Sequence, residues 1–173
     1  MELPGTNYLY MLITVSITYA GFAALLMIFR QIIGGRLSNY DVYLIRTVLL
    51  RSFIVAIAAM TPPLLALFDL SHTAVWRLSS LIAALLLGAY VVTFPARRRT
   101  VTDFPAPISA WITYALSLCV MVFLLMIALR IFIQPAAGPF ASSVTAFLVL
   151  SFFNYLAQLK HLVRGHSGNQ EHS

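Results

Sequence analysis

Residues 8–29 read YLYMLITVSITYAGFAALLMIF, an unbroken run of 22 residues without a charged side chain. A helix needs about 20 consecutive apolar residues to cross the hydrocarbon core of a bilayer, so this run predicts a membrane-spanning helix. A cleaved signal peptide is not expected, because Glu2 and no basic residue precede the run. No small-residue cleavage site separates it from Arg30, which supports the same interpretation.

The composition of the whole chain is also typical of a membrane protein. Of its 173 residues, 61% are hydrophobic and only 9% are charged, whereas a typical soluble domain carries about 25% charged residues. A water-soluble chain of this length would expose large apolar patches, but lipid solvates such surface. Because backbone polar groups must be satisfied internally in lipid, we predict an all-α integral membrane protein.

Four further apolar runs follow, and prolines, glycines or basic residues separate them. Ser38 and Asp41 have the S-x-x-D spacing of a helix start, which places the beginning of the second helix near Asn39. Pro95 is expected to end the third run. We predict a polytopic transmembrane helical bundle that forms a single domain over residues 1–164 and ends in a disordered polar tail over 165–173. The predicted spans cover residues 8–29, 44–68, 75–94, 108–133 and 140–163.

Pro62 and Pro63 fall inside the second run and predict a kink there. A proline has no amide hydrogen, so the carbonyls of Ala58 and Ala59 lose their helical partners. An unsatisfied carbonyl is costly in lipid, so we expect this turn to face the bundle interior. The Thr61 hydroxyl is the candidate donor to a freed carbonyl, and a hinge at this kink is the alternative to a packing role.

Lysine and arginine divide unevenly between the two ends of the predicted spans. The positive-inside rule places the end with more of them in the cytoplasm, so we predict an outside N-terminus and a cytoplasmic C-terminus in a bacterial inner membrane. Four spans, the alternative, would put basic clusters on opposite sides. With five spans, one end carries Arg30, Arg36, Arg46, Arg51, Arg97, Arg98, Arg99, Lys160 and Arg164, and the other carries Arg77 and Arg130.

Chemistry that needs acidic groups at membrane depth is not expected. All five Asp and Glu residues lie in predicted loops, helix ends or the tail, whereas proton relays and sodium sites usually rest on intramembrane carboxylates. No histidine lies inside an apolar run, and Cys119 has no second cysteine to pair with. No nucleophile–base pair is visible. We therefore predict a non-enzyme with no catalytic residue, cofactor or metal.

The candidate binding residues are basic. Arg51 lies 18 residues before Asp69, or about 27 Å along a helix, so we expect it at the inner edge of the membrane with its side chain snorkelling to the headgroups. The alternative is an inward-facing site for an anion or lipid headgroup. Five residues turn a helix by about 140°, so Arg46 should point elsewhere. Contact with anionic headgroups on the cytoplasmic side is expected for Arg46, Arg51, Arg97, Arg98 and Arg99.

Other polar and small residues predict packing. Ser16 and Ser80 each begin a stripe of small residues spaced by four, which favours close helix packing within the chain, with self-association as the alternative. Asn154 is the only amide well inside a span and is expected to make an interhelical hydrogen bond.

The best functional interpretation is a non-enzymatic subunit, scaffold or regulator of an inner-membrane assembly. Its partners would be membrane lipids and either a second copy or another membrane protein. Nucleic acid is excluded as a partner, because the basic residues behind the net charge of +6 lie between apolar runs. The alternative is a small oligomeric channel or transporter for an anion or amphipath, with Arg46 and Arg51 at its cytoplasmic mouth.

Overall fold

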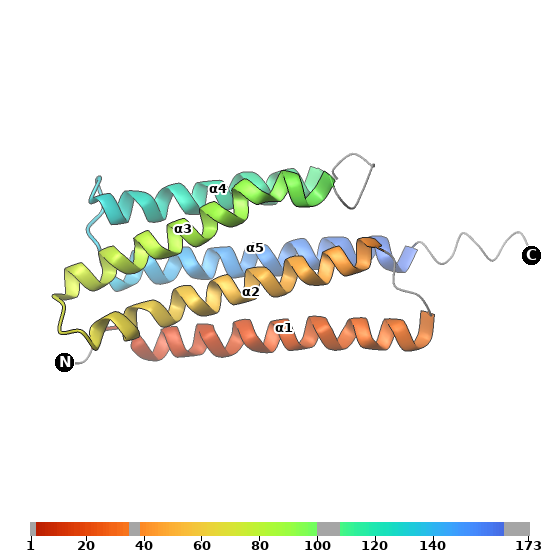
Figure 1. Ribbon diagram of the computed structural model, residues 1–173, viewed down its shortest axis with the longest axis horizontal. Helices are drawn as coiled ribbons and strands as arrows, with labels where there is room; N and C mark the ends of the chain where they lie inside the picture. The colour runs from red at the N-terminus through yellow and green to blue at the C-terminus, as the bar shows by residue number, and fades with distance from the viewer. Residues whose placement is uncertain (1–2, 35–38, 100–107, 165–173) are drawn as a thin grey trace, which may run out of the picture.

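The computed structural model describes residues 3–34, 39–99 and 108–164, and their regular structure is entirely α-helical. Figure 1 shows the helices side by side and alternating in direction, so that α1 begins at one end of the bundle and α5 finishes at the other. We call this second end the basic end, because Arg46 and Arg97 lie towards it. The helices are α1 (Thr6–Gly34), α2 (Asn39–Ala66), α3 (His72–Arg99), α4 (Ile108–Leu129) and α5 (Ala137–Arg164).

Each of the five helices is long and apolar enough to cross a membrane. Large apolar side chains, such as Phe53, Leu85 and Phe153, are exposed on the outside of the bundle. Lipid solvates such a surface, whereas water would not. The chain is therefore a multi-pass membrane protein of the all-α class, as predicted, although its orientation stays a prediction. The spanning parts are Thr6–Phe29, Val42–Ala66, His72–Arg97, Ala110–Leu129 and Ala137–Ala157.

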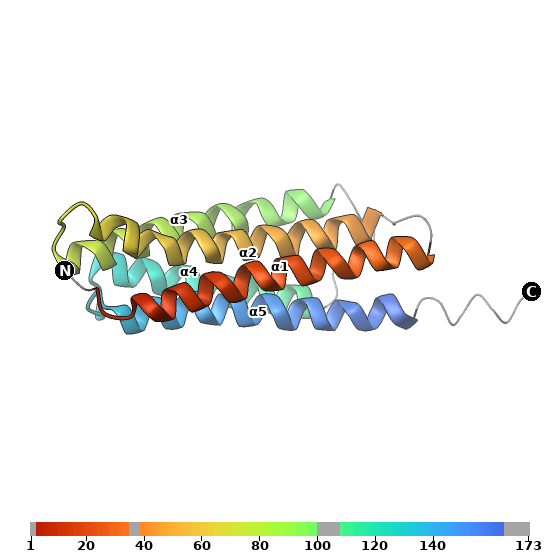
Figure 2. The same cartoon turned by 90° about the horizontal axis from the view of Figure 1, so that it is seen from below.

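The central helix of the bundle is α2. It packs against α1, α3 and α5, and 56% of its span is buried, against 28–39% for the spans of the other helices. Views from two directions place α1 and α4 towards the periphery (Figures 1 and 2). A polar side chain on the inner face of α2 therefore lies deep inside the bundle.

The two prolines do not end α2, which continues for about one turn beyond Pro63. Ala59 and Thr61 are buried, so this turn faces the interior as expected. The Thr61 hydroxyl, however, donates to the carbonyl of Ile57 at 2.8 Å. The prediction that it bonds a carbonyl freed by Pro62 or Pro63 is therefore wrong, because a threonine hydroxyl in a helix bonds the carbonyl four residues before its own position.

Proline also fails to end α3, which runs through Pro95 to Arg99 rather than stopping as predicted. Side chains supply extra donors to the carbonyls of this turn. The Thr93 hydroxyl reaches the Tyr90 carbonyl at 3.2 Å, and Arg97 Nη2 reaches the same oxygen at 2.7 Å. Pro95 frees the carbonyl of Val91, four residues before it. The donors from Thr93 and Arg97 therefore add bonds to this turn at Tyr90 and do not replace the one that the proline removes.

A left-handed residue ends α4 earlier than predicted, at Leu129. Arg130 has φ of 60°, and the amide of Ile131 bonds the Met126 carbonyl at 2.9 Å. The amide of Arg130 bonds the Ile127 carbonyl at 3.2 Å. These two bonds form a Schellman motif, which is a common way to end a helix, although glycine usually holds the position that Arg130 takes. The predicted tail, residues 165–173, lies outside the described residues.

Candidate functional site

Arg51 lies inside the bundle. Its side chain is only 3% exposed, and it stands nine residues after Val42, the first residue of the α2 span. That separation corresponds to about 13 Å along the helix axis. A snorkelling side chain would keep its charged head in the headgroup region, so the prediction that Arg51 snorkels is wrong.

Two aromatic rings from other helices hold the guanidinium. Arg51 Nε donates a hydrogen bond of 2.6 Å to the hydroxyl of Tyr90 on α3. The guanidinium carbon of Arg51 lies 5.0 Å from the Tyr90 ring centroid and 5.9 Å from that of Phe147 on α5. Cation–π attraction is strongest where water is excluded, so these contacts offset part of the cost of removing the charge from water. They explain why Arg51 turns inward.

These contacts leave Arg51 incompletely satisfied. A guanidinium has five N–H donors, yet within the described part of the chain its bond to Tyr90 is the only hydrogen bond of Arg51. Its Nη1 is buried and has no hydrogen-bond partner. No Asp or Glu lies within the membrane-spanning segments. A buried charge without a counter-charge is strongly unfavourable, so this group is suited to bind an anion.

Arg97 approaches the same tyrosine from the basic end. It is half-buried near the end of α3, and its Nη2 donates to the Tyr90 carbonyl at 2.7 Å. Its guanidinium carbon lies 4.7 Å from the Tyr90 ring centroid. Since the guanidinium carbons of Arg51 and Arg97 are each within 5.0 Å of that centroid, they are at most about 10 Å apart. The structure therefore brings two predicted site residues together around one ring.

Of the remaining predicted site residues, only Arg46 can be placed relative to this pair. Arg46 is exposed, which separates it from the buried Arg51 and agrees with the prediction that the two point in different directions. Arg98 and Arg99 belong to α3, but their side chains lie outside the described part of the structure. Asn154 is half-buried, and it has an interaction partner in the structure. That this contact joins two helices stays a prediction.

Sequence reasoning missed Tyr90 and Phe147, because an aromatic residue in an apolar run usually indicates lipid contact or packing. One signal for Tyr90 was available. It precedes Arg97 by seven residues, or two helical turns, which places the two side chains on one face. An aromatic residue two turns before an arginine at a helix end can therefore indicate a cation–π contact between its ring and the guanidinium.

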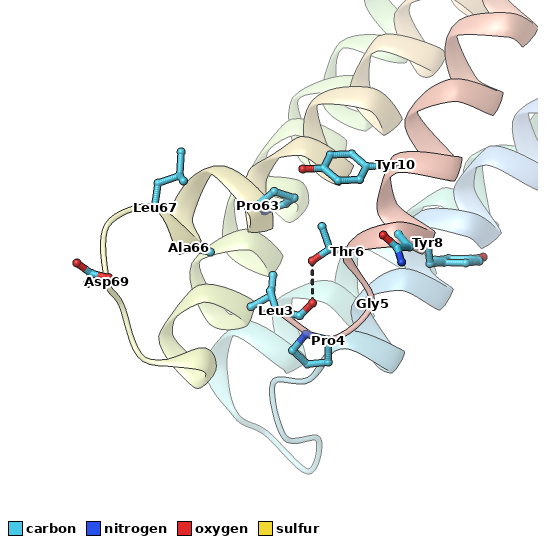
Figure 3. Close-up of a pocket in the computed structure, with 11 residues that line it drawn as sticks. Leu3, Pro4, Gly5, Thr6, Tyr8, Tyr10, Pro63, Ala66, Leu67 and Asp69 are labelled. Atoms are coloured by element: carbon cyan, nitrogen blue, oxygen red, sulfur yellow. Dashed lines mark hydrogen bonds between the residues drawn. The ribbon is translucent and has the colours of Figure 1, made fainter. Parts of the chain in front are cut away.

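A separate hollow lies at the other end of the bundle, between the start of α1 and the end of α2 (Figure 3). It has a volume of about 1120 Å³. Two of its polar side chains are used within the chain, since the Thr6 hydroxyl donates to the Leu3 carbonyl at 2.7 Å and the Tyr8 hydroxyl bonds Thr145 at 2.7 Å. Asp69 lines the hollow but is exposed to solvent. The hollow therefore offers no concentrated charge, and the Arg51 cluster remains the candidate site.

Comparison of the chain with protein-family models, with curated proteins and with solved structures finds no match in any of the three. The functional argument therefore rests on the residues themselves.

Proposed function

We propose that this chain is a multi-pass protein of a bacterial inner membrane that binds an anion in its interior, as part of a small channel or transporter. The observation that supports this most directly is the buried and unpartnered Nη1 of Arg51. A charged side chain at the centre of a membrane helix costs about 2.5–3.5 kcal/mol. A bound anion would supply both the missing counter-charge and the missing acceptor.

The proposed orientation places the basic end in the cytoplasm and the N-terminus outside, on the basis of the positive-inside rule. In this orientation the exposed Arg46 lies at the cytoplasmic mouth, and Arg51 lies about 13 Å further along α2 than the start of the span. Anions would first meet the exposed arginines and then reach the buried one. The positive charges near the mouth raise the local concentration of anions.

A role as a non-enzymatic subunit, scaffold or regulator is the second proposal. It accounts for the apolar outer faces of the peripheral helices, which another membrane protein could cover as well as lipid does. It does not require a guanidinium with unused donors in the interior, since an apolar side chain of similar volume would pack there at lower cost. We therefore place anion binding first.

Anion binding can be measured on the purified protein in a neutral detergent, with thiocyanate as the probe in isothermal titration calorimetry. Arg51→Gln should abolish binding, because it removes the interior charge, whereas Arg46→Gln should reduce binding less than threefold. If Arg51→Gln does not purify as a folded protein, Arg97→Gln serves as the second variant and should weaken binding. Unchanged thiocyanate affinity in the folded variant of either interior arginine would contradict the proposal.

A further inference from the structure

The free donors of Arg51 and the aromatic side chains between it and the basic end indicate the class of anion. We propose that the interior site takes an organic monocarboxylate, whose carboxylate binds Arg51 and whose apolar body takes the place of the Tyr19 ring. This inference rests on the proposed function, since it names the ligand of the same site.

The free edge of the Arg51 guanidinium is the first argument. Tyr90 accepts the hydrogen bond from Nε, and Arg51 makes no other hydrogen bond within the part of the chain that the structure describes. The N–H groups of Nη1 and Nη2 form a planar fork that matches the two oxygens of one carboxylate. The Tyr90 and Phe147 ring centroids are 6.0 Å apart and lie 5.0 and 5.9 Å from the guanidinium carbon. Both rings therefore lie on the same side of the guanidinium, and neither blocks the opposite side.

The charge of the site is the second argument. Arg51 carries one positive charge, and no Asp or Glu lies within the membrane-spanning segments. A carboxylate neutralises this charge, whereas a divalent anion would leave a net negative charge in the interior, which is also unfavourable. Arg97 is not assigned to the ligand, because it donates to the carbonyls of Tyr90 and Thr93 and has a further interaction.

Aromatic side chains separate Arg51 from the basic end, where α5 finishes (Figure 1). One face of α5 carries Phe147, Ser151 and Tyr155 at intervals of four residues, and all three are buried. Tyr19 of α1 covers this face, since its hydroxyl donates to the Ser151 carbonyl at 3.1 Å and its ring centroid lies 6.0 Å from that of Tyr155. Tyr19 is also near enough to Arg51 to interact with its charge. A ligand from the basic end therefore meets rings before it meets the guanidinium.

These rings favour an organic acid over an inorganic anion. A strongly hydrated ion would lose its water there without gaining an apolar contact, whereas burial of the apolar body of an organic acid is favourable. Rotation of the Tyr19 side chain breaks its hydrogen bond to Ser151 and frees a space the size of a phenol ring. A ligand ring in that space replaces the edge contacts that Tyr19 makes with Phe152 and Tyr155.

Such a carboxylate has two sources, a water-soluble organic acid and a fatty acid of the bilayer. The first arm of the test titrates benzoate into the purified full chain in neutral detergent, with acetate, benzamide and thiocyanate as comparisons. Acetate has the charge without the ring, and benzamide has the ring without the charge. The second arm reconstitutes the chain in phosphatidylcholine vesicles that contain either oleate or, as an uncharged control, oleyl alcohol. Thermal unfolding at mildly alkaline pH, where oleate is ionised, then reports which amphipath binds.

We expect benzoate to bind at least about tenfold more tightly than each comparison, or oleate to stabilise the protein more than oleyl alcohol does. Arg51→Lys should weaken benzoate binding by about tenfold but thiocyanate binding by less than about threefold, since an ammonium keeps the charge and loses the fork.

Tyr19→Phe should strengthen benzoate binding by about fivefold, because a ring that is not bonded to the Ser151 carbonyl is easier to displace. A merely structural tyrosine would not give this gain. Tyr10→Phe is the matched control, because Tyr10 lies on the same helix beside the hollow at the other end of the bundle. It should leave the affinity within about twofold of the parent protein. In the second arm, the same variants should change the stabilisation by oleate in the same directions.

The outcomes separate the two proposals. Benzoate affinity no higher than that of a comparison ligand, with equal stabilisation by oleate and oleyl alcohol, would overturn the carboxylate inference and leave anion binding in place. Binding of none of these anions would overturn the proposed function itself. A response confined to one arm supports the inference and identifies the source. If Arg51→Lys does not fold, Tyr19→Phe decides the matter, and an unchanged or weaker affinity in that variant would count against the inference.

Discussion

Removal of the Tyr90 hydroxyl tests whether a single hydrogen bond supports the buried guanidinium. In Tyr90→Phe the ring stays in place, so the cation–π contact with Arg51 and the edge contact with Phe147, whose centroid is 6.0 Å away, are retained. The substitution removes the acceptor of the 2.6 Å bond from Arg51 Nε. Arg51 then has no hydrogen-bond acceptor among the described residues, and its charge remains buried.

The size of the effect follows from the type of bond that is lost. A hydrogen bond to a charged group contributes about 1.5–3 kcal/mol, and the full desolvation penalty applies when its partner is removed from a buried site. Arg51 is 3% exposed, so water does not readily replace the hydroxyl. We therefore expect Tyr90→Phe to lower the free energy of unfolding by about 1.5–3 kcal/mol.

A double-mutant cycle with Arg51→Leu isolates this bond. Unfolding in mixed micelles, followed by circular dichroism, gives the free energy of unfolding for the parent, the two single variants and the double variant. In the Arg51→Leu background, Tyr90→Phe should cost less than about 0.5 kcal/mol or should stabilise the protein, because the hydroxyl has lost its charged donor. Equal costs in the two backgrounds would refute the reasoning, since they would show that the hydroxyl does not act through Arg51.

Three further outcomes test the topology and the packing. A reporter that is active only in the cytoplasm should be active when fused after Ser173 and silent when fused after Ala137, and the reverse pattern would invert the proposed orientation. Gly88→Leu should destabilise the chain by about 1–3 kcal/mol, because even a Cβ at Gly88 would lie 3.4 Å from the sulfur of Met121. The control Gly21→Leu, where a Cβ meets nothing within 4 Å, should be neutral or stabilising in the same unfolding assay. Arg130→Gly should stabilise the protein by about 1 kcal/mol, because glycine adopts φ of 60° without strain, and a loss of stability would show that the Arg130 side chain contributes more than its backbone costs.

The stripes of small residues illustrate where sequence patterns succeeded. Ser16 and Ala20 are buried in the bundle, as are Ser80 and Ala84, so packing within the chain explains both stripes. The number of helices, the interior position of the proline turn in α2 and the start of that helix at Asn39 also followed from the sequence. These features depend on local composition and spacing, which a sequence contains directly.

Helix ends were harder to predict, because they depend on contacts that proline and glycine rules omit. The run through Pro95 continues as helix where Thr93 and Arg97 bond the nearby backbone. The fourth helix ends at Leu129 because the next residue, Arg130, adopts a left-handed conformation. Hydropathy is nearly uniform along these runs, so it predicts neither the continuation of the third helix nor the early end of the fourth.

Sequence alone determined that this protein resides in a membrane, because only lipid solvates so much apolar surface and only helices satisfy the backbone within it. Only the tertiary structure decided whether the Arg51 side chain is buried or extends to the headgroups. Its distance along the chain from Asp69 is compatible with both a snorkelling and a buried side chain, since an arginine can turn towards either. The choice depends on Tyr90 and Phe147, which lie 39 and 96 residues away in the sequence and meet the guanidinium only after three helices have packed together.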